Sequence, residues 1–351
     1  QDYVSLAYMT GILPIKKYGS HSALNMFSEY SMTDPGNLAE YFGFTEDEVR
    51  ALCSDHGINF DEAKVLQEHK NGLGIVGATE KAVDEVVRRG YKNIFYIGIG
   101  GTVLYANQMA HIVREEGSTI PLFIENAADF CVVDNPHFSK DSVVVIESIS
   151  GDTKEVVAAV DKTHEIGATV IGYVEKEGSP LYEKSDYLIT TTGGGYYFWY
   201  TVTLRFMYHA GQFPRYGKFF EELKNMPENV VEIYKKADVK AAEYAKAYQD
   251  EPIQYLVGSG NLEDWAVCYG MCIMEEMQWM RTRPISASNF FHGTLEVIDK
   301  DTSVILIKGE DKTRPLMDRV ENFVHKISAK VTVFDSKDFE LKGISDEFRG
   351  M

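Results

Sequence analysis

The stretch VVVIESISGDTKEVV, residues 143–157, predicts a strand, a hydroxyl-rich loop and the start of a helix. Four apolar residues in a row, Val143 to Ile146, are typical of a strand buried on both faces of a parallel sheet. From Thr153 onward the apolar residues are spaced as on one face of a helix. The loop between them carries more hydroxyl groups than a turn requires, so we expect it to bind a ligand.

The chemistry of this loop suits a phosphate group. A loop that leaves a parallel strand and enters a helix presents backbone N–H groups, and the helix dipole adds partial positive charge there. Ser148, Ser150 and Thr153 would add hydroxyl donors, and Gly151 would let the backbone approach closely. We therefore predict a phosphate cradle without a lysine or a metal. The alternative is an N-cap that serves only its own helix, but a cap needs one such residue.

A second glycine-rich loop is expected at the same edge of the sheet. The sequence NIFYIGIGG (93–101) predicts a strand that ends in glycines, with Gly100, Gly101 and Thr102 as substrate-binding candidates. It is not a Walker A loop, because no Gly-Lys-Ser/Thr follows, and it lacks the third glycine of a dinucleotide fingerprint. A phosphate on a small metabolite is therefore the expected ligand.

Strands and helices alternate from residue 77, which predicts an α/β fold with a parallel sheet. A long helical region (196–249) follows, and the pattern then restarts. IQYLVGSGN (253–261) resembles NIFYIGIGG, and TSVILIKGEDKTRPLMDRV (302–320) parallels the stretch around the hydroxyl loop. These matches predict one unit used twice, offset by about 160 residues. The second copy has Lys308-Gly309-Glu310-Asp311 in place of the hydroxyls, so folding of the unit does not require them.

The strand–SxSGxT–helix pattern, the repeated halves and FHGTLEVID (291–299) together resemble the sugar isomerase (SIS) domain proteins. Within that group the likeness is to the fructosamine 6-phosphate deglycases, including the fructoselysine 6-phosphate enzymes. The resemblance implies two tandem SIS-type αβα sandwiches, residues 71–235 with the phosphate loop and residues 236–351 with the catalytic residues. Because such relatives continue past the residue that matches Met351, it also implies a second domain that is truncated here.

Candidate catalytic residues lie in the second half. Glu275 and Glu276 interrupt an apolar segment, and burial there would raise a carboxyl pKa toward neutrality, as a carbon-acid base requires. The two are adjacent, so only one is expected to face a pocket. The resemblance implies Glu276 as the proton-transfer base and His292, 16 residues later, as the ring-opening residue. It also implies no cofactor or metal, and a homodimer whose histidine reaches the neighbouring subunit's pocket.

The expected activity is that of a fructosamine 6-phosphate deglycase of the fructoselysine type, which releases glucose 6-phosphate and a free amine. The alternatives are an aldose–ketose phosphosugar isomerase and a phosphosugar sensor that does not react. A net charge of −18 argues against nucleic acid or an anionic membrane as the main partner. We expect a cytoplasmic location, in which the four cysteines are buried free thiols.

Residues 1–70 do not follow the SIS pattern and are expected to form a mostly helical N-terminal extension. TEDEVRALCSDHG (45–57) predicts a helix with a capping box formed by Thr45 and Glu48 and with Gly57 at its end. The segment resembles a fragment of AAA-ATPase-like proteins. It contains no Walker A loop, so no ATPase activity is expected from it.

Overall fold

The computed structural model describes residues 46–351, and the chain divides into two units between Ala63 and Lys64. The first unit contains helix α1 (Glu46–Asp55), and helix α2 (Phe60–Gly74) begins in it. Gly57 follows α1 with a positive φ of 69°, and its N–H donates to the carbonyl of Ser54 at 3.0 Å. The capping box predicted from Thr45 and Glu48 lies outside the described residues and side chains.

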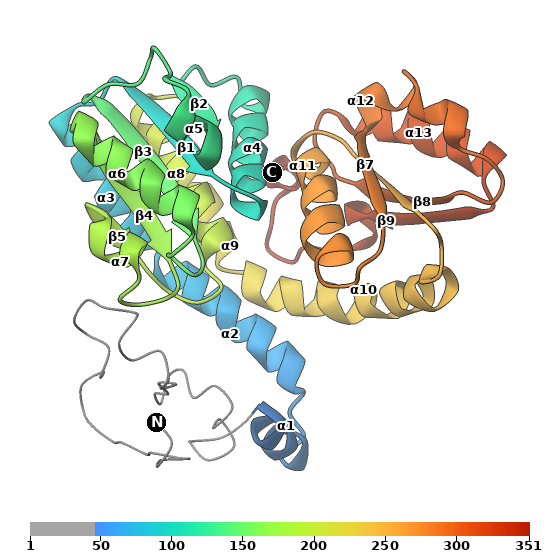
Figure 1. The fold of residues 1–351 in the computed structure, drawn as a ribbon. Coiled ribbons are helices and arrows are strands. Elements are labelled where there is room, and N and C mark those ends of the chain that lie inside the picture. The colour runs from blue at the N-terminus through green and yellow to red at the C-terminus, as the bar shows by residue number, and fades with distance from the viewer. Residues whose placement is uncertain (1–45) are drawn as a thin grey trace, which may run out of the picture. The chain divides into compact units, whose positions relative to one another are not determined.

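The second unit, residues 64–351, begins with the rest of α2 and contains a five-stranded parallel sheet of order β2-β1-β3-β4-β5 (Figure 1). We call this sheet and its helices the first lobe. Its strands are β1 (Asn93–Gly98), β2 (Leu122–Asn126), β3 (Ser142–Ser148), β4 (Thr169–Val174) and β5 (Tyr187–Ile189). Its helices are α3 (Val76–Arg89), α4 (Gly101–Glu115), α5 (Ala127–Val132), α6 (Lys154–Ile166), α7 (Pro180–Lys184), α8 (Gly195–His209) and α9 (Tyr216–Leu223).

The sheet of the first lobe is buried on both faces, as the unbroken apolar runs predict. Successive side chains of a strand point to opposite faces. Ile94 and Tyr96 of β1 therefore join the core formed with α3, α4 and α8, whereas Phe95 and Ile97 join the core formed with α5, α6 and α7. The four side chains are fully buried, and their strand is held between two layers of helices.

The second lobe repeats this arrangement around a four-stranded parallel sheet of order β7-β6-β8-β9. Its strands are β6 (Gln254–Gly258), β7 (Thr282–Ser286), β8 (Ser303–Lys308) and β9 (Lys330–Asp335). Its helices are α10 (Met226–Tyr248), α11 (Asn261–Cys268), a π-helix (Tyr269–Glu275), α12 (Ala287–Phe290) and α13 (Arg314–Ile327), with 3-10 turns at Thr294–Val297, Ser336–Asp338 and Asp346–Phe348. The predicted fold of two αβα sandwiches with parallel sheets is confirmed.

The backbone at the first turn of each lobe shows how closely the two copies correspond. Gly100 precedes α4 with φ 60° and ψ −129°, and Gly260 precedes α11 with φ 58° and ψ −131°. A residue with a side chain rarely adopts these backbone angles, so both lobes require glycine at this position. The two helices that follow pack against each other, and Asp264 of α11 binds Asn107 (3.0 Å) and His111 (3.3 Å) of α4.

Within residues 46–351, no helix has the length and apolar character needed to cross a membrane.

The four cysteines differ in burial. All four are free, but only Cys268 is buried, and Cys53, Cys131 and Cys272 are half-buried. The prediction that all four are buried was therefore wrong. Cys131, for instance, lies in α5, a short helix that covers one face of the first sheet and keeps a side open to solvent.

Candidate active site

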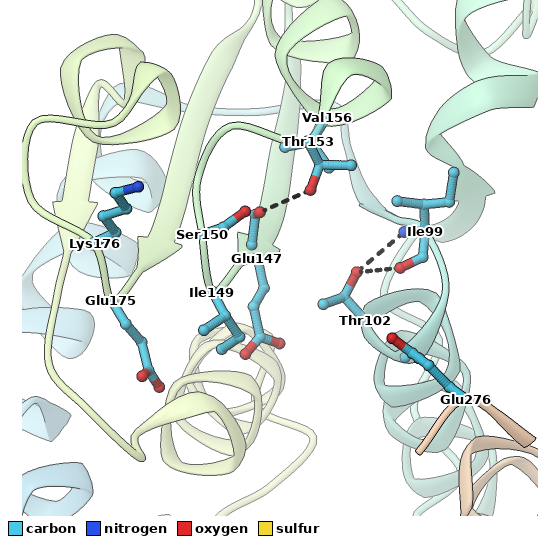
Figure 2. A pocket seen from close by; sticks show the side chains of 12 residues that line it. Ile99, Thr102, Glu147, Ile149, Ser150, Thr153, Val156, Glu175, Lys176 and Glu276 are labelled. Carbon is cyan, nitrogen blue, oxygen red and sulfur yellow. Dashed lines mark hydrogen bonds between the residues drawn. The ribbon is translucent and has the colours of Figure 1, made fainter. Parts of the chain in front are cut away.

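A cavity of about 710 Å³ opens at the carboxyl ends of β1 and β3 (Figure 2). These strands are neighbours, but the chain leaves β1 toward β2 on one side and β3 toward β4 on the other. Ligands of open parallel sheets bind at such a switch point. The cavity is lined by Ile99, Gly101, Thr102, Glu147, Ser148, Ile149, Ser150, Thr153, Val156, Glu175, Lys176 and Glu276.

The hydroxyl loop forms one wall of this cavity. Ser148 is buried, and its Oγ accepts a hydrogen bond from the N–H of Gly151 at 3.1 Å and lies 3.4 Å from Thr153 Oγ1. Ser150 is exposed, and its hydroxyl donates to Asp152 Oδ1 at 2.5 Å. The structure therefore brings the predicted phosphate-binding residues to one place, although Ser150 must turn away from Asp152 before it can bind a ligand.

The helix that follows the loop has a free amino end. Thr153 occupies the N-cap position of α6, but its side chain makes no capping hydrogen bond. Apart from the long 3.4 Å contact with Ser148 Oγ, the hydroxyl therefore remains available to a ligand, and so do the first N–H groups of a 13-residue helix. Gly151 has φ +67°, and a Cβ there would overlap Ser179 and Val174, so only glycine fits.

The glycine loop after β1 contributes less than the sequence suggested. Gly101 and Thr102 line the cavity, but Gly100 is not among the lining residues. The hydroxyl of Thr102 donates to the carbonyl of Ile99 and accepts from its N–H, both at 3.0 Å. Thr102 thus closes its own loop, and its hydroxyl hydrogen already has an acceptor.

Glu276 reaches the cavity from the second lobe, on the opposite side from the hydroxyl loop (Figure 2). Its neighbour Glu275 points elsewhere, because Glu275 Oε1 accepts hydrogen bonds from the N–H (3.2 Å) and the hydroxyl (2.5 Å) of Thr282 in β7. Only one of the adjacent carboxylates therefore lines the cavity, and it is Glu276.

The expected burial of Glu276 was wrong. The segment Tyr269–Glu275 is a π-helix, and the N–H of Glu276 donates to the carbonyl of Met271, five residues back, at 3.1 Å. After Met274 the chain leaves the core, and the side chains of residues 275–279 are all exposed. Trp279 is 91% exposed and has a positive φ of 57°, which a bulky residue adopts only rarely.

His292 does not line the cavity. It follows α12, its side chain is exposed, and its N–H donates to the carbonyl of Asn289 at 2.9 Å. Within one chain, Glu276 and the hydroxyl loop are thus brought together, whereas His292 lies outside their cavity.

The sequence patterns did not single out three ionisable residues that line the cavity: Glu147, Glu175 and Lys176. Glu147 is the second-last residue of β3, and the other two directly follow β4, so the carboxyl ends of the predicted strands could have located them. Figure 2 shows Glu175 and Lys176 pointing in opposite directions. Lys176 is exposed and has no ion-pair partner among residues 46–351, which leaves its ammonium available to an anion.

Glu147 differs from the other two carboxylates because it is 1% exposed. Burial raises its pKa to about 7, the hydrogen bond from Trp199 lowers it, and the nearby charge of Glu175 raises it. Glu175 is half-buried, and its Oε1 accepts from the N–H of Gly193 at 2.9 Å and lies 3.0 Å from the hydroxyl of Tyr173. The wall near β4 is therefore acidic apart from Lys176.

The second lobe fills the corresponding position with its own anion. Asp311 is buried, and it accepts hydrogen bonds from the N–H of Thr313 (2.8 Å) and from the N–H of Asn261 (3.3 Å) at the start of α11. A Cβ at Gly260 would overlap this carboxylate, which shows how closely the backbone approaches it. The side chain of Asp311 thus occupies the place at which the first lobe leaves its donors open.

The part of the chain that contains the hydroxyl loop is also the part that matches a known protein family. Residues 89–210 match the SIS domain, which covers β1 to α8 and includes the hydroxyl loop. The chain is 29% identical over 269 residues to a fructosamine deglycase of Bacillus subtilis (strain 168), covering 74% of this chain and 81% of that protein. It is 23% identical over 260 residues to the fructoselysine 6-phosphate deglycase of Escherichia coli O157:H7, covering 72% and 76%.

The fold of this chain is also similar to that of solved protein structures. A crystal structure of a Bacillus subtilis protein assigned as a phosphosugar isomerase superposes with a TM-score of 0.73 at 25% sequence identity. The match covers 79% of this chain and 88% of that protein. The similarity thus extends over both lobes.

Proposed function

We propose that this chain, which carries a SIS domain, is a deglycase that converts a fructosamine 6-phosphate into glucose 6-phosphate and a free amine. Its relatives are phosphosugar deglycases and isomerases, and it is an enzyme of that class. The observation that carries the finer proposal is that one cavity joins the open hydroxyl loop to the carboxylate of Glu276.

In the proposed reaction the phosphate binds the amino end of α6 through Ser148, Ser150 and Thr153. The exposed ammonium of Lys176 lies on the same cavity and would add a positive charge. Binding of the phosphate fixes the distance from the loop to the reacting carbons and uses remote binding energy for orientation. Glu276 then moves a proton between C1 and C2 of the sugar. Water hydrolyses the resulting C1 imine.

We further propose that the working form is a homodimer and that His292 acts in the partner's cavity, where it opens the sugar ring. Two observations support this. His292 is exposed and lies outside the cavity of its own chain. Met271, Met277 and Trp279, which surround Glu276 in sequence, are 37%, 65% and 91% exposed, and a second copy would cover them.

The test of the activity is incubation with fructoselysine 6-phosphate and, separately, with fructose 6-phosphate. Release of amine and glucose 6-phosphate in equal amounts supports a deglycase. Conversion of fructose 6-phosphate alone would instead make the protein an isomerase, and binding without turnover would make it a sensor. Glu276→Gln should abolish turnover and leave phosphosugar binding intact, whereas the matched control Glu275→Gln should stay active because Glu275 faces β7.

The test of the shared site is a mixture of two inactive variants, Glu276→Gln and His292→Ala. If each site takes these residues from different chains, a mixed dimer has one site with both changes and one intact site. Random mixing should then restore about a quarter of the wild-type activity, because half of the dimers are mixed. No recovery after exchange of subunits would contradict a shared site.

A further inference from the structure

Glu147 is a buried carboxyl group that the proposed reaction has not yet used. It lies in β3 directly before Ser148, so the strand carries the phosphate-binding serine and this glutamate on consecutive residues. Its side chain is 1% exposed and yet lines the cavity shared by the hydroxyl loop and Glu276. Burying a carboxyl group in a protein is costly unless hydrogen-bond partners satisfy it.

The two oxygens of Glu147 have different surroundings. Oε2 accepts a hydrogen bond from Nε1 of Trp199 in α8, which fixes the orientation of the carboxyl group. Oε1 has no hydrogen-bond partner among residues 46–351. It lies against Gly195, where any side chain would overlap it. One oxygen is therefore held by the protein, and the other is left for a group that the chain itself does not supply.

The charged and titratable groups around Glu147 favour its protonated form. Burial raises the pKa of Glu147 to about 7 although the hydrogen bond from Trp199 lowers it, and the negative charge of Glu175, after β4, acts in the same direction as burial. Tyr173 of β4 and Tyr105 of α4 are the other titratable groups that interact with it, and burial raises the pKa of both phenols, so they stay neutral. Near neutral pH, the glutamate thus carries a proton in a substantial share of molecules.

We propose that Glu147 is the acid that donates a proton to O2 of the substrate while Glu276 removes the proton from C1. This inference rests on the proposed deglycase reaction and adds a second proton-transfer residue to it. The two carboxyl groups line one cavity in contrasting surroundings, Glu276 exposed and Glu147 buried. Such a contrast separates the base from the acid in other enzymes that use paired carboxyl groups.

The steps balance with these two residues and one water. Glu276 takes the C1 proton, the C1–H electrons form the C1=C2 bond, and the C2 carbonyl oxygen takes the proton of Glu147, which gives an enolamine. Glu276 then returns its proton to C2, and the nitrogen lone pair forms the C1 iminium ion. Water adds to C1 and gives a proton to Glu147, which restores the acid. The carbinolamine finally transfers its hydroxyl proton to nitrogen as the C–N bond breaks.

The first test is the variant Glu147→Gln, which keeps the size of the side chain and an oxygen for Trp199. We expect kcat to fall by about 10²- to 10⁴-fold, the range for loss of a general acid. Affinity for fructose 6-phosphate, measured by calorimetry, should change less than about threefold, because the phosphate loop is intact. The wild-type kcat/KM should fall as pH rises through about 7, and the variant should lack this fall.

Two further variants separate an acid from a structural residue. Trp199→Phe removes the hydrogen bond that lowers the pKa of Glu147, so the fall in activity should move to higher pH. Glu175→Gln removes the charge that raises the same pKa, so the fall should move to lower pH. A residue that only supports α8 would change the rate in these variants without shifting the pH profile in opposite directions.

The outcomes distinguish the two proposals. If wild-type protein releases the amine and Glu147→Gln keeps its rate and pH profile, the acid role of Glu147 is overturned and the deglycase reaction stands. If wild-type protein releases no amine from any fructosamine 6-phosphate, the deglycase reaction fails and the acid role fails with it. Circular dichroism of each variant checks that the fold is unchanged.

Discussion

The buried carboxyl group of Glu147 should make the stability of the protein depend on pH in a way that Glu147→Gln removes. The ordinary pKa of a glutamate, 4.5, is raised to about 7 in the folded chain. Below pH 4.5 the group is protonated in both the folded and the unfolded states, so its ionisation costs nothing. As the pH rises from 4.5 to 7, the unfolded chain loses the proton freely while the folded chain retains it.

The magnitude follows from this difference in pKa. Each unit corresponds to about 1.4 kcal/mol, so the free energy of unfolding of the wild type should fall by about 3 kcal/mol relative to the variant between pH 4 and pH 8. The direction is a loss of stability as the pH rises, because the folded state binds more protons. Most of the loss should occur between pH 4.5 and 7 and end just above pH 7.

The assay is urea unfolding of the two proteins at several pH values, followed by tryptophan fluorescence. The difference between them at each pH is the relevant quantity, because other titrating groups cancel. Glu177→Gln, a change at an exposed position in the loop after β4, serves as the control. A wild-type-minus-variant difference that stays constant within about 0.5 kcal/mol from pH 4 to 8 would refute the reasoning, since Glu147 would then ionise as easily in the folded state.

Three other changes test the loops of the two lobes. Thr153→Val should weaken binding of fructose 6-phosphate about 10- to 100-fold in calorimetry, because a hydrogen bond to a charged group is lost. Gly151→Ala should weaken the same binding and lower the melting temperature, because the positive φ and the contact with Ser179 both exclude a Cβ. Asp311→Asn should lower the free energy of unfolding by about 1–3 kcal/mol in urea, because two backbone N–H groups lose a charged acceptor.

Much of the fold could be predicted because its signals are local. Apolar runs that end in glycines or hydroxyl residues predicted the strands. The repeat of this pattern after about 160 residues predicted the second lobe. The hydroxyl loop was predictable for the same reason, since Ser148 to Thr153 follow one strand and precede one helix. Such features depend on neighbours in sequence, which a pattern of residues records directly.

The parts that could not be predicted depend on contacts between distant segments. Glu147 occupies a position in an apolar strand, and only the packing of Trp199, 52 residues later, explains why a carboxyl group is tolerated there. Thr102 has the side chain of a ligand donor, but its hydroxyl is used by Ile99. The apolar residues around Glu276 suggested burial, yet Met277 and Trp279 are 65% and 91% exposed, because an apolar residue type does not by itself determine whether its side chain packs into the core.

The π-helix before Glu276 has a consequence for the direction in which this cavity-lining carboxylate points. A wide turn of this kind holds one more residue than an ordinary α-turn, so it changes the direction in which every later side chain leaves the axis. If the same seven residues, Tyr269–Glu275, wound as an ordinary α-helix, each would advance by about 100°, which is more than in the wider turn, and the positions that follow would face another direction. The winding of this one segment therefore decides which of the two adjacent glutamates faces the cavity, without any change in their chemistry.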